Sequence, residues 1–566
     1  MRRDRGTGMV SRRGFAALAL LGAGAALLGG CSLNGVMPGS SPIELPVVNE
    51  ARLAANQGAS AAARVLEGGT LTCQSAPLST VNPHEAWGYW ERLVCRCMFD
   101  SLTQYDFDQM TLVGKAATSW EADLFSERFT FHLREGMAFQ NGESVTSTCF
   151  ANAWNVLVAH GGHGLASCLS MVVGYEDVAA GVSGAQLDLE CPDDYTLIVN
   201  LAHSFPDFAY LASLPQLAPM SVASFKAEGG FGDVPCGNGP FCLDGAPQAD
   251  TGVHLVRNAS YWGTNAHVDA LQFQVNEDFT DVGEAIKTGN LDVALVPVDQ
   301  AGALSDELGP AGPDRMLNPD AQVAHEGFGS VCMLVCNCAR EPFDQVETRR
   351  ALERALDVQV LATTLGLDPL CAADGALLPS NLGYEERAWK LPDNELEKGL
   401  SDQVDAALGT DELEMLCDPC LLAGLGQEVA AQLDDAGVAV RVDTPSWSEY
   451  LSRLQEGDFE LALVCHLPLC DAAGAELFSL FHSRGGDNLG GYASTEVDEA
   501  LESAWEMSDE AARLDVLREV CQTIAQDMPV VPLLYAGPGV ACSSRVNSLA
   551  VSADYTLDFA GCWLSA

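Results

Sequence analysis

Cysteine and histidine are the residues of this chain whose types and spacing could support metal or redox chemistry. The sequence holds 20 cysteines. Three close pairs stand out among them: Cys95 with Cys97, Cys336 with Cys338, and Cys417 with Cys420. These pairs lack the repeated Cys-x2-Cys spacing of a zinc site, so we interpret them as structural disulfides or buried thiols. Disulfides are the default for an exported protein.

A histidine pair, His160 and His163, flanks two glycines. Two imidazoles do not complete a metal site, and the glycines predict a solvated loop. The motifs His-Glu-x-x-His and Gly-x-Ser-x-Gly, the Walker loop and the dinucleotide-binding glycine pattern are all missing from the sequence. We therefore predict no metal site, no cofactor and no catalytic residues, and an exported enzyme is the weaker alternative.

The first residues carry the pattern of an export signal. Five arginines precede the apolar run Phe15–Leu28, which is followed by Gly29-Gly30-Cys31. The Gly-Gly-Cys end resembles the processing site of bacterial lipoproteins, in which Cys31 would become the lipidated N-terminus. Ser11-Arg12-Arg13-Gly14-Phe15 also resembles a twin-arginine signal. We expect a protein anchored by lipid on the extracytoplasmic face of the cell membrane, with the twin-arginine pathway as a candidate export route.

Composition narrows the class of partner and the number of lobes. The formal net charge of −49 makes nucleic acid an improbable partner. Hydrophobic residues make up 48% of a 566-residue chain, which is longer than one hydrophobic core usually supports, so two or more lobes are expected. Beyond the signal, no apolar run is long enough to span a bilayer.

The pattern of apolar residues predicts alternating strands and helices after a flexible tether at 31–66. The clearest succession predicts these elements: strand 413–417, helix 426–435, strand 438–442, helix 446–454 opened by a Ser446/Glu449 capping box, and strand 459–464. Two successive crossovers of this kind imply a parallel sheet. Two more helices are expected, one from about Thr495 and one carrying Leu514 to Ile524 before Pro529.

Several short sequence segments, called family-like phrases below, resemble motifs of the extracellular solute-binding proteins of dipeptide, oligopeptide and nickel ABC importers (family 5). The phrases are Ser79–His84, Met98–Thr103, Phe129–Gly136, Phe139–Thr146, Gly237–Phe241, Arg257–Gly263, Cys336–Asp344 and Asn488–Tyr492. A helix from Val346 to Leu361, capped by Asp344, would follow the seventh phrase. The chain departs from the family pattern at Cys149-Phe150, where an Asp-Val or Asp-Phe pair is usual, which we interpret as a local change at a helix start.

The resemblance implies an α/β, two-lobed periplasmic-binding-protein-like fold of type II, with an extra subdomain and hinge closure over a central cleft. The expected parts are a signal peptide at 1–30, a lipidated tether at 31–66, lobe I at 67–112 with 236–329 and 530–566, the extra subdomain at 113–235, and lobe II at 330–529.

The resemblance also implies a function and a ligand site. The protein would capture oligopeptides or dipeptides by lobe closure and deliver them to the permease and ATPase subunits of a membrane importer, itself acting as a monomer. Asp471 matches the aspartate that pairs with the ligand's ammonium group in family members, although a loop or cap role fits it equally. Candidate cleft walls are Trp87, Tyr89, Trp90 and Tyr492, each of which could instead be ordinary core packing.

Two other functions keep the same fold. The ligand could be a nickel chelate or haem, which relatives in this family carry. The chain could also be a surface receptor that senses a peptide and signals without transport, because closure would look the same to either membrane partner.

Overall fold

The computed structural model describes residues 43–44 and 65–565, apart from 107–108, 110, 161–164, 227–229, 233, 248–251, 277–280, 327–328, 379–411, 468–471 and 508. Cys31, His163 and Asp471 therefore lie outside the described residues, as do the expected signal and nearly all of the tether. Among the helices of the described part, none has the length and apolar character needed to cross a membrane.

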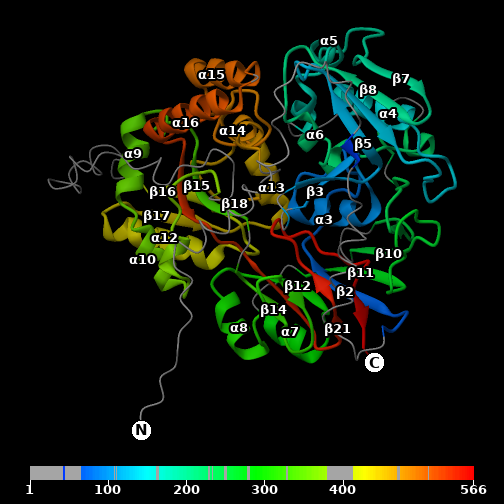
Figure 1. Ribbon diagram of the computed structural model, residues 1–566. Coiled ribbons are helices and arrows are strands. Elements are labelled where there is room, and N and C mark those ends of the chain that lie inside the picture. The colour runs from blue at the N-terminus through cyan, green and yellow to red at the C-terminus, as the bar shows by residue number, and fades with distance from the viewer. Residues whose placement is uncertain are drawn as a thin grey trace, which may run out of the picture. The chain divides into compact units, whose positions relative to one another are not determined.

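A seven-stranded sheet forms the first layer of the described fold (Figure 1). Its strands, in spatial order, are β14 (Val323–Ala324), β20 (Gly539–Cys542), β12 (Val293–Val296), β2 (Thr70–Ser75), β11 (Ala270–Val275), β10 (Val253–Arg257) and β9 (Phe241–Leu243). Strand β2 is parallel to β11 and β12, and the other neighbours are antiparallel. Helices α7 (Val282–Thr288) and α8 (Ala301–Leu308) pack beside β12 and β14, and α3 (Tyr89–Met98) packs beside β9.

An antiparallel sheet forms a second unit of structure within residues 43–200. Its order is β1 (Ile43–Glu44), β5 (Ala117–Ala122), β6 (Arg128–Leu133), β8 (Thr196–Asn200) and β7 (Leu189–Asp193). In β6, Phe129, Phe131 and Leu133 are buried while the residues between them are more exposed, as the two-residue period of a half-buried strand requires. Helix α4 (Ser147–His160) covers the buried face through contacts with β7 and β8.

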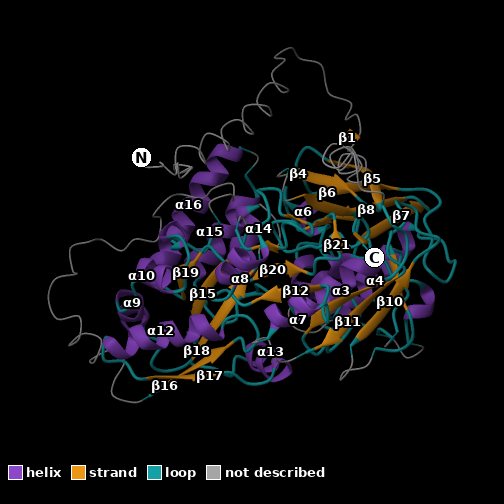
Figure 2. Ribbon diagram, turned by 90° about the horizontal axis from the view of Figure 1, so that it is seen from below, coloured by secondary structure: helices purple, strands orange, loops and turns teal. Residues whose placement is uncertain are grey.

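The third sheet is the one that the sequence predicted most fully. Its order is β17 (Val440–Asp443), β16 (Leu413–Cys417), β18 (Leu461–His466), β15 (Val331–Cys336) and β19 (Val530–Leu534). Strand β16 is parallel to both β17 and β18, which confirms the expected crossovers. All six residues of β15 are buried, because helices surround this sheet (Figure 2).

The helices beside the third sheet in the described chain are α9 (Val346–Arg354), α10 (Val358–Thr364), α12 (Ala423–Asp435), α13 (Trp447–Glu456), α14 (Ala473–Phe481), α15 (Thr495–Trp505) and α16 (Glu510–Asp527). Helices α12, α13, α15 and α16 lie close to the predicted ranges, whereas the sequence did not predict α14. Ser446 caps α13 as predicted, accepting a hydrogen bond from the Glu449 amide. The single helix expected at 346–361 was wrong: Asp357 caps a separate second helix, α10, and the residue before α9 is Gln345, with no side-chain cap.

The remaining elements are short. They are α5 (Tyr175–Ala179), α6 (Phe208–Leu211), β3 (Thr103–Asp106), β4 (Thr111–Gly114), β13 (Met316–Leu317), β21 (Val546–Asn547), β22 (Leu549–Ala550) and β23 (Trp563–Leu564), with 3-10 turns at Leu165–Leu169, Pro215–Leu217, Val222–Ser224 and Pro369–Cys371.

The chain passes twice between the seven-stranded sheet and the third sheet. One passage joins β14 to β15, and the other joins β19 to β20. Strand β19 pairs with β15, although we had expected the chain from residue 530 onward to belong with the first lobe. The strand pairing places the second passage at 535–538, after β19, because the apolar strand completes the edge of the third sheet.

A buried junction around Asp100 fixes the C-terminal end of α3. The Asp100 carboxylate accepts hydrogen bonds from Tyr261 Oη (2.9 Å) and Trp262 Nε1 (2.8 Å), and it lies 3.3 Å from Lys115 Nζ. The Asn238 side chain bonds the Asp100 backbone on both its N–H and its C=O. These contacts join three of the family-like phrases and hold the helix that carries Tyr89 and Trp90.

Glycine is required beside this junction. A Cβ atom added at Gly237 would lie 2.0 Å from the Met98 carbonyl oxygen, and one added at Gly239 would lie 2.6 Å from the Met98 carbonyl carbon. The Gly-x-Gly spacing therefore allows the backbone to pass directly against the end of α3.

Candidate functional site

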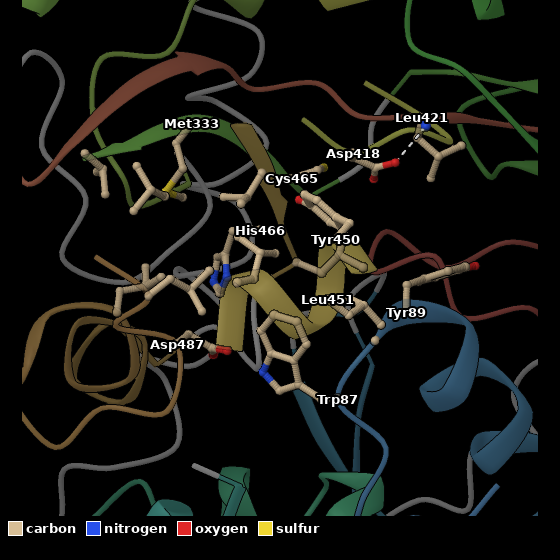
Figure 3. A pocket seen from close by; sticks show the side chains of 18 of the residues that line it. Trp87, Tyr89, Met333, Asp418, Leu421, Tyr450, Leu451, Cys465, His466 and Asp487 are labelled. Carbon is tan, nitrogen blue, oxygen red and sulfur yellow. Dashed lines mark hydrogen bonds between the residues drawn. The ribbon is translucent and has the colours of Figure 1, made fainter. Parts of the chain in front are cut away.

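A pocket with a cavity volume of about 140 Å³ lies between α3 and the third sheet (Figure 3). Its wall on one side is the start of α3 and the residues just before it, with Trp87 and Tyr89. The opposite wall is built by α13, with Trp447 and Tyr450, and by the end of β18. The lining combines aliphatic side chains with aromatic ones, which are Trp87, Tyr89, Trp90, Trp447, Tyr450, Phe481, Tyr492 and Tyr555.

The structure brings the four aromatic residues predicted as cleft walls to this one pocket, but they differ in exposure. Trp87 and Tyr89 are partly buried, whereas Trp90 is only 2% exposed and Tyr492 only 5%. The Trp90 ring meets the Tyr89 ring edge-on at 5.1 Å. Trp90 thus supports Tyr89 from behind, and its direct contact with a ligand stays a prediction, as does that of the other three.

Tyrosine hydroxyls at the pocket are bonded to the protein. Tyr450 donates to the Leu463 carbonyl (3.0 Å), Tyr492 to an Asp527 oxygen (2.6 Å) and Tyr89 to the Tyr555 carbonyl (3.2 Å). Burial raises the pKa of all three phenols. The hydroxyls are therefore neutral at physiological pH and fix the rings in place, and the ring surfaces form the apolar part of the pocket.

Four charged or titratable side chains also line the pocket: Arg92, Asp418, His466 and Asp487. The Asp418 carboxylate accepts from the amides of Cys420 (2.7 Å) and Leu421 (3.0 Å), the second of which Figure 3 shows as a dashed line. Burial raises the pKa of Asp418 to about 6, although these two hydrogen bonds oppose the shift.

His466 and Asp487 are each held by a neighbour on α14. His466 Nε2 lies 2.9 Å from Glu476 Oε2. Burial lowers the pKa of His466, but the hydrogen bond and charge of Glu476 outweigh it and the pKa is raised overall. Asp487 accepts from the Ser479 hydroxyl at 2.7 Å. The pocket therefore combines a largely apolar wall with a few fixed polar groups, as small-ligand sites in proteins usually do.

Comparison with known proteins decides the family. Residues 111–487 match the model of the bacterial extracellular solute-binding proteins, family 5 Middle, which covers more than half of the chain. This chain belongs to that family. It is a family of binding proteins rather than of enzymes, and its members act outside the cytoplasm.

Relatives of this solute-binding protein share its length and fold. An oligopeptide-binding protein of Bacillus subtilis is 24% identical, with 78% of this chain and 83% of the relative covered. A di/tripeptide-binding protein of Pseudomonas aeruginosa is 23% identical, with the same coverage. The crystal structure of Haemophilus influenzae OppA in complex with RPPGFSPFR superposes with a TM-score of 0.75 at 21% identity, covering 88% of this chain and all of that one. The expected α/β binding-protein fold is confirmed.

The family-like phrases of this solute-binding protein act mainly in its framework. Asp100, Asn238, Tyr261 and Trp262 form the junction at the end of α3 and do not line the pocket. The sequence placed Trp447 only within the expected helix 446–454, and Asp418 only between Cys417 and Cys420. Arg92, His466 and Asp487 were not singled out from the sequence. These residues come from separate elements that meet at the pocket only in the folded chain.

Sixteen cysteines of this solute-binding protein carry free thiols in the part of the chain that the structure describes, which are all of those described except Cys420 and Cys521. The default expectation of disulfides is not met at these sixteen cysteines. Cys95, Cys97, Cys336, Cys417 and Cys420 are buried. Burial raises the pKa of Cys242 to about 11, and that of Cys336 and Cys417 further. Protonated, enclosed thiols react slowly, which favours a packing role.

Metal ligands do not gather in the described residues. No group of three or more His, Cys, Asp or Glu side chains there has the geometry to hold a metal ion. His160 is the last residue of α4 rather than part of the predicted loop, and His163 lies outside the described residues.

Proposed function

We propose that this protein is a lipid-anchored receptor of an ABC importer, which captures dipeptides or oligopeptides by lobe closure and delivers them to the permease. The observation that carries the proposal is the pocket whose opposite walls come from α3 and from α13 with β18. A ligand in that position touches α3, which packs on the seven-stranded sheet, and β18 of the third sheet. Its binding energy therefore favours the arrangement in which the two sheets approach each other.

Contacts between the two sides support a closing mechanism. The Val298 amide donates to the Leu421 carbonyl at 3.3 Å. Arg513 of α16 pairs with Asp207 at 3.2 Å. A Cβ atom at Gly88, just before α3, would lie 3.2 Å from Leu451 Cδ1 of α13. In the described part of the chain, two backbone passages link the elements that these contacts join, so opening requires torsion changes in only those short segments.

Peptides are the ligand class that the relatives and the pocket chemistry favour together. The relatives reported above are named for binding oligopeptides or di- and tripeptides. Aromatic walls with a few fixed charges suit a ligand that has apolar side chains and charged ends, and bridging waters can accommodate differences in sequence. Asp471 is our candidate for the ligand's ammonium group.

The anchoring part of the proposal depends on the sequence around Cys31. Gly29-Gly30-Cys31 follows the apolar run Phe15–Leu28, as at lipoprotein processing sites. A lipidated Cys31 would hold the receptor beside the permease, on the extracytoplasmic face of the membrane.

A panel of candidate ligands tests the proposed function. The full-length chain is denatured and refolded to remove carried ligand, and its melting temperature is measured with short peptides, nickel chelates and haem. We expect a rise in melting temperature with peptides only. Binding confined to the native state stabilises the folded protein by about 2.7 kcal/mol at a hundredfold excess over Kd, so the rise should be measurable. Asp471→Ala should reduce that rise, whereas Asp515→Ala, a change at an exposed helix position, should not.

A rise with nickel chelates or haem alone would refute the peptide assignment while leaving the family assignment in place. A peptide-dependent rise that is equal in Asp471→Ala and in the parent chain would retire Asp471 as the ammonium partner.

A further inference from the structure

Arg92 is a cationic side chain that lines the pocket and has no role in the described structure outside it. It lies on the first turns of α3, is partly buried, and lines both the main pocket and a smaller neighbouring cavity. No side-chain hydrogen bond or ion pair joins it to any residue in the described part of the chain. Arg96, one turn further along the same helix, instead pairs with Asp554 at 2.5 Å and also bonds Thr556.

The surroundings make an unpaired guanidinium costly. Burial lowers the pKa of Arg92, and the largest compensating charge, that of Asp487, forms no ion pair with it. Arg96 adds like-charge repulsion, while Glu91 and Asp554 oppose it from a distance. A buried cation without a close partner is uncommon in proteins, and such groups commonly serve a binding site.

A second basic side chain faces the same space. His466, at the end of β18, lines the pocket, and the charge of Arg92 acts to lower its pKa. The two groups come from opposite walls, and His466 carries its own partner, Glu476, whereas the described residues offer Arg92 no close partner. Asp418 and Asp487 also line the pocket, so Arg92 is a local cationic point beside acidic groups.

We propose that Arg92 binds a carboxylate of the ligand, so that the ligands of this protein carry a free carboxylate group inside the pocket. This inference rests on the proposed function for its ligand class. A guanidinium offers paired donors that match the two oxygens of a carboxylate. The carboxylate can be the C-terminus of a peptide or the side chain of an acidic residue. The cavity of about 140 Å³ is small for a ligand pocket, which favours a short ligand whose charged end is enclosed.

Calorimetric titration with three peptides separates the two carboxylate sources. The probes are Ala-Leu-Phe, its C-terminal amide, and Ala-Glu-Phe amide. We expect Arg92→Gln to weaken binding of a carboxylate-bearing probe by about tenfold to a hundredfold and to leave Ala-Leu-Phe amide unchanged. Loss with Ala-Leu-Phe identifies the C-terminus as the partner, and loss with Ala-Glu-Phe amide identifies the side chain. Equal weakening of the acid and amide probes, or no weakening at all, overturns the inference.

The ligand-free protein supplies a readout that does not depend on peptides. Because Arg92 has no close partner among the described residues and its burial is costly, Arg92→Gln should keep or raise the melting temperature of the parent chain, whereas Arg96→Gln should lower it through loss of the Asp554 pair. A drop in Arg92→Gln as large as that in Arg96→Gln shows a structural role and overturns the inference.

N-acetyl-leucine and its amide distinguish failure of this inference from failure of the proposed function. Arg92-dependent binding of N-acetyl-leucine with no binding of any peptide refutes the peptide function and retains the carboxylate site. Peptide binding with no dependence on Arg92 retains the function and refutes the site. Absence of Arg92-dependent binding with every carboxylate probe refutes the site.

Discussion

Replacing Asp100 with alanine is expected to lower the free energy of unfolding by about 3–5 kcal/mol. The substitution leaves the buried Tyr261 hydroxyl and the Trp262 indole N–H without their acceptor, and it removes the carboxylate opposite Lys115. Buried donors that lose a partner carry the full cost of their desolvation. Urea unfolding followed by circular dichroism measures the change.

Two variants make this result specific. Asp100→Asn retains an oxygen acceptor but loses the charge, so it should recover part of the lost stability. Asp515→Ala removes a carboxylate that is 74% exposed and should change the unfolding free energy by less than about 0.5 kcal/mol. If Asp100→Ala behaved like Asp515→Ala, the junction would not hold α3 as described.

Asp418→Asn is expected to stabilise the protein at neutral pH by up to about 3 kcal/mol. The folded chain raises the pKa of Asp418 from 3.8 to about 6, mainly through burial. Asparagine keeps the oxygen that accepts from the amides of Cys420 and Leu421, and it has no charge to desolvate. Urea unfolding of both proteins at pH 4, 5, 6 and 7 measures the difference.

The pH dependence has a definite sign. A carboxyl group whose pKa is raised on folding contributes stability that is fully present below about pH 3.8 and is lost as the pH rises through about 6. The advantage of Asp418→Asn should therefore be small at pH 4 and grow to its full size by pH 7. Asp368→Asn is a matched control, because Asp368 also accepts the amide two residues on but is exposed. An advantage that does not vary with pH would contradict a buried, titrating Asp418.

The sequence was most informative where structure is local. The elements between Leu413 and His466 follow from apolar periodicity and from the Ser446 cap, and each appears in the structure within a few residues of its expected bounds. The split between α9 and α10 was missed because Asp357 caps the second helix, and a periodic apolar pattern continues across such a break. The placement of β19 was missed because strand pairing is decided by distant partners.

The pocket was less predictable because its walls are far apart in the sequence. Trp87 and Tyr89 could be named as aromatic wall residues, but Trp447 and Tyr450 meet them only when α13 lies opposite α3. The burial that shifts the pKa of Asp418 is likewise a property of the assembled fold. Arg92 and Arg96 look alike in sequence, but in the described part of the chain Asp554 pairs with Arg96 and no carboxylate pairs with Arg92.

Photo-crosslinking tests most directly whether this protein binds peptides in the pocket between α3 and α13. A tripeptide with a photoreactive side chain is bound to the refolded, ligand-free chain, and the crosslinked residues are identified by mass spectrometry. We expect crosslinks within 87–92 and 447–454 that an excess of unlabelled peptide abolishes. Crosslinks that lie elsewhere, or that unlabelled peptide does not compete away, would contradict the proposed site and function.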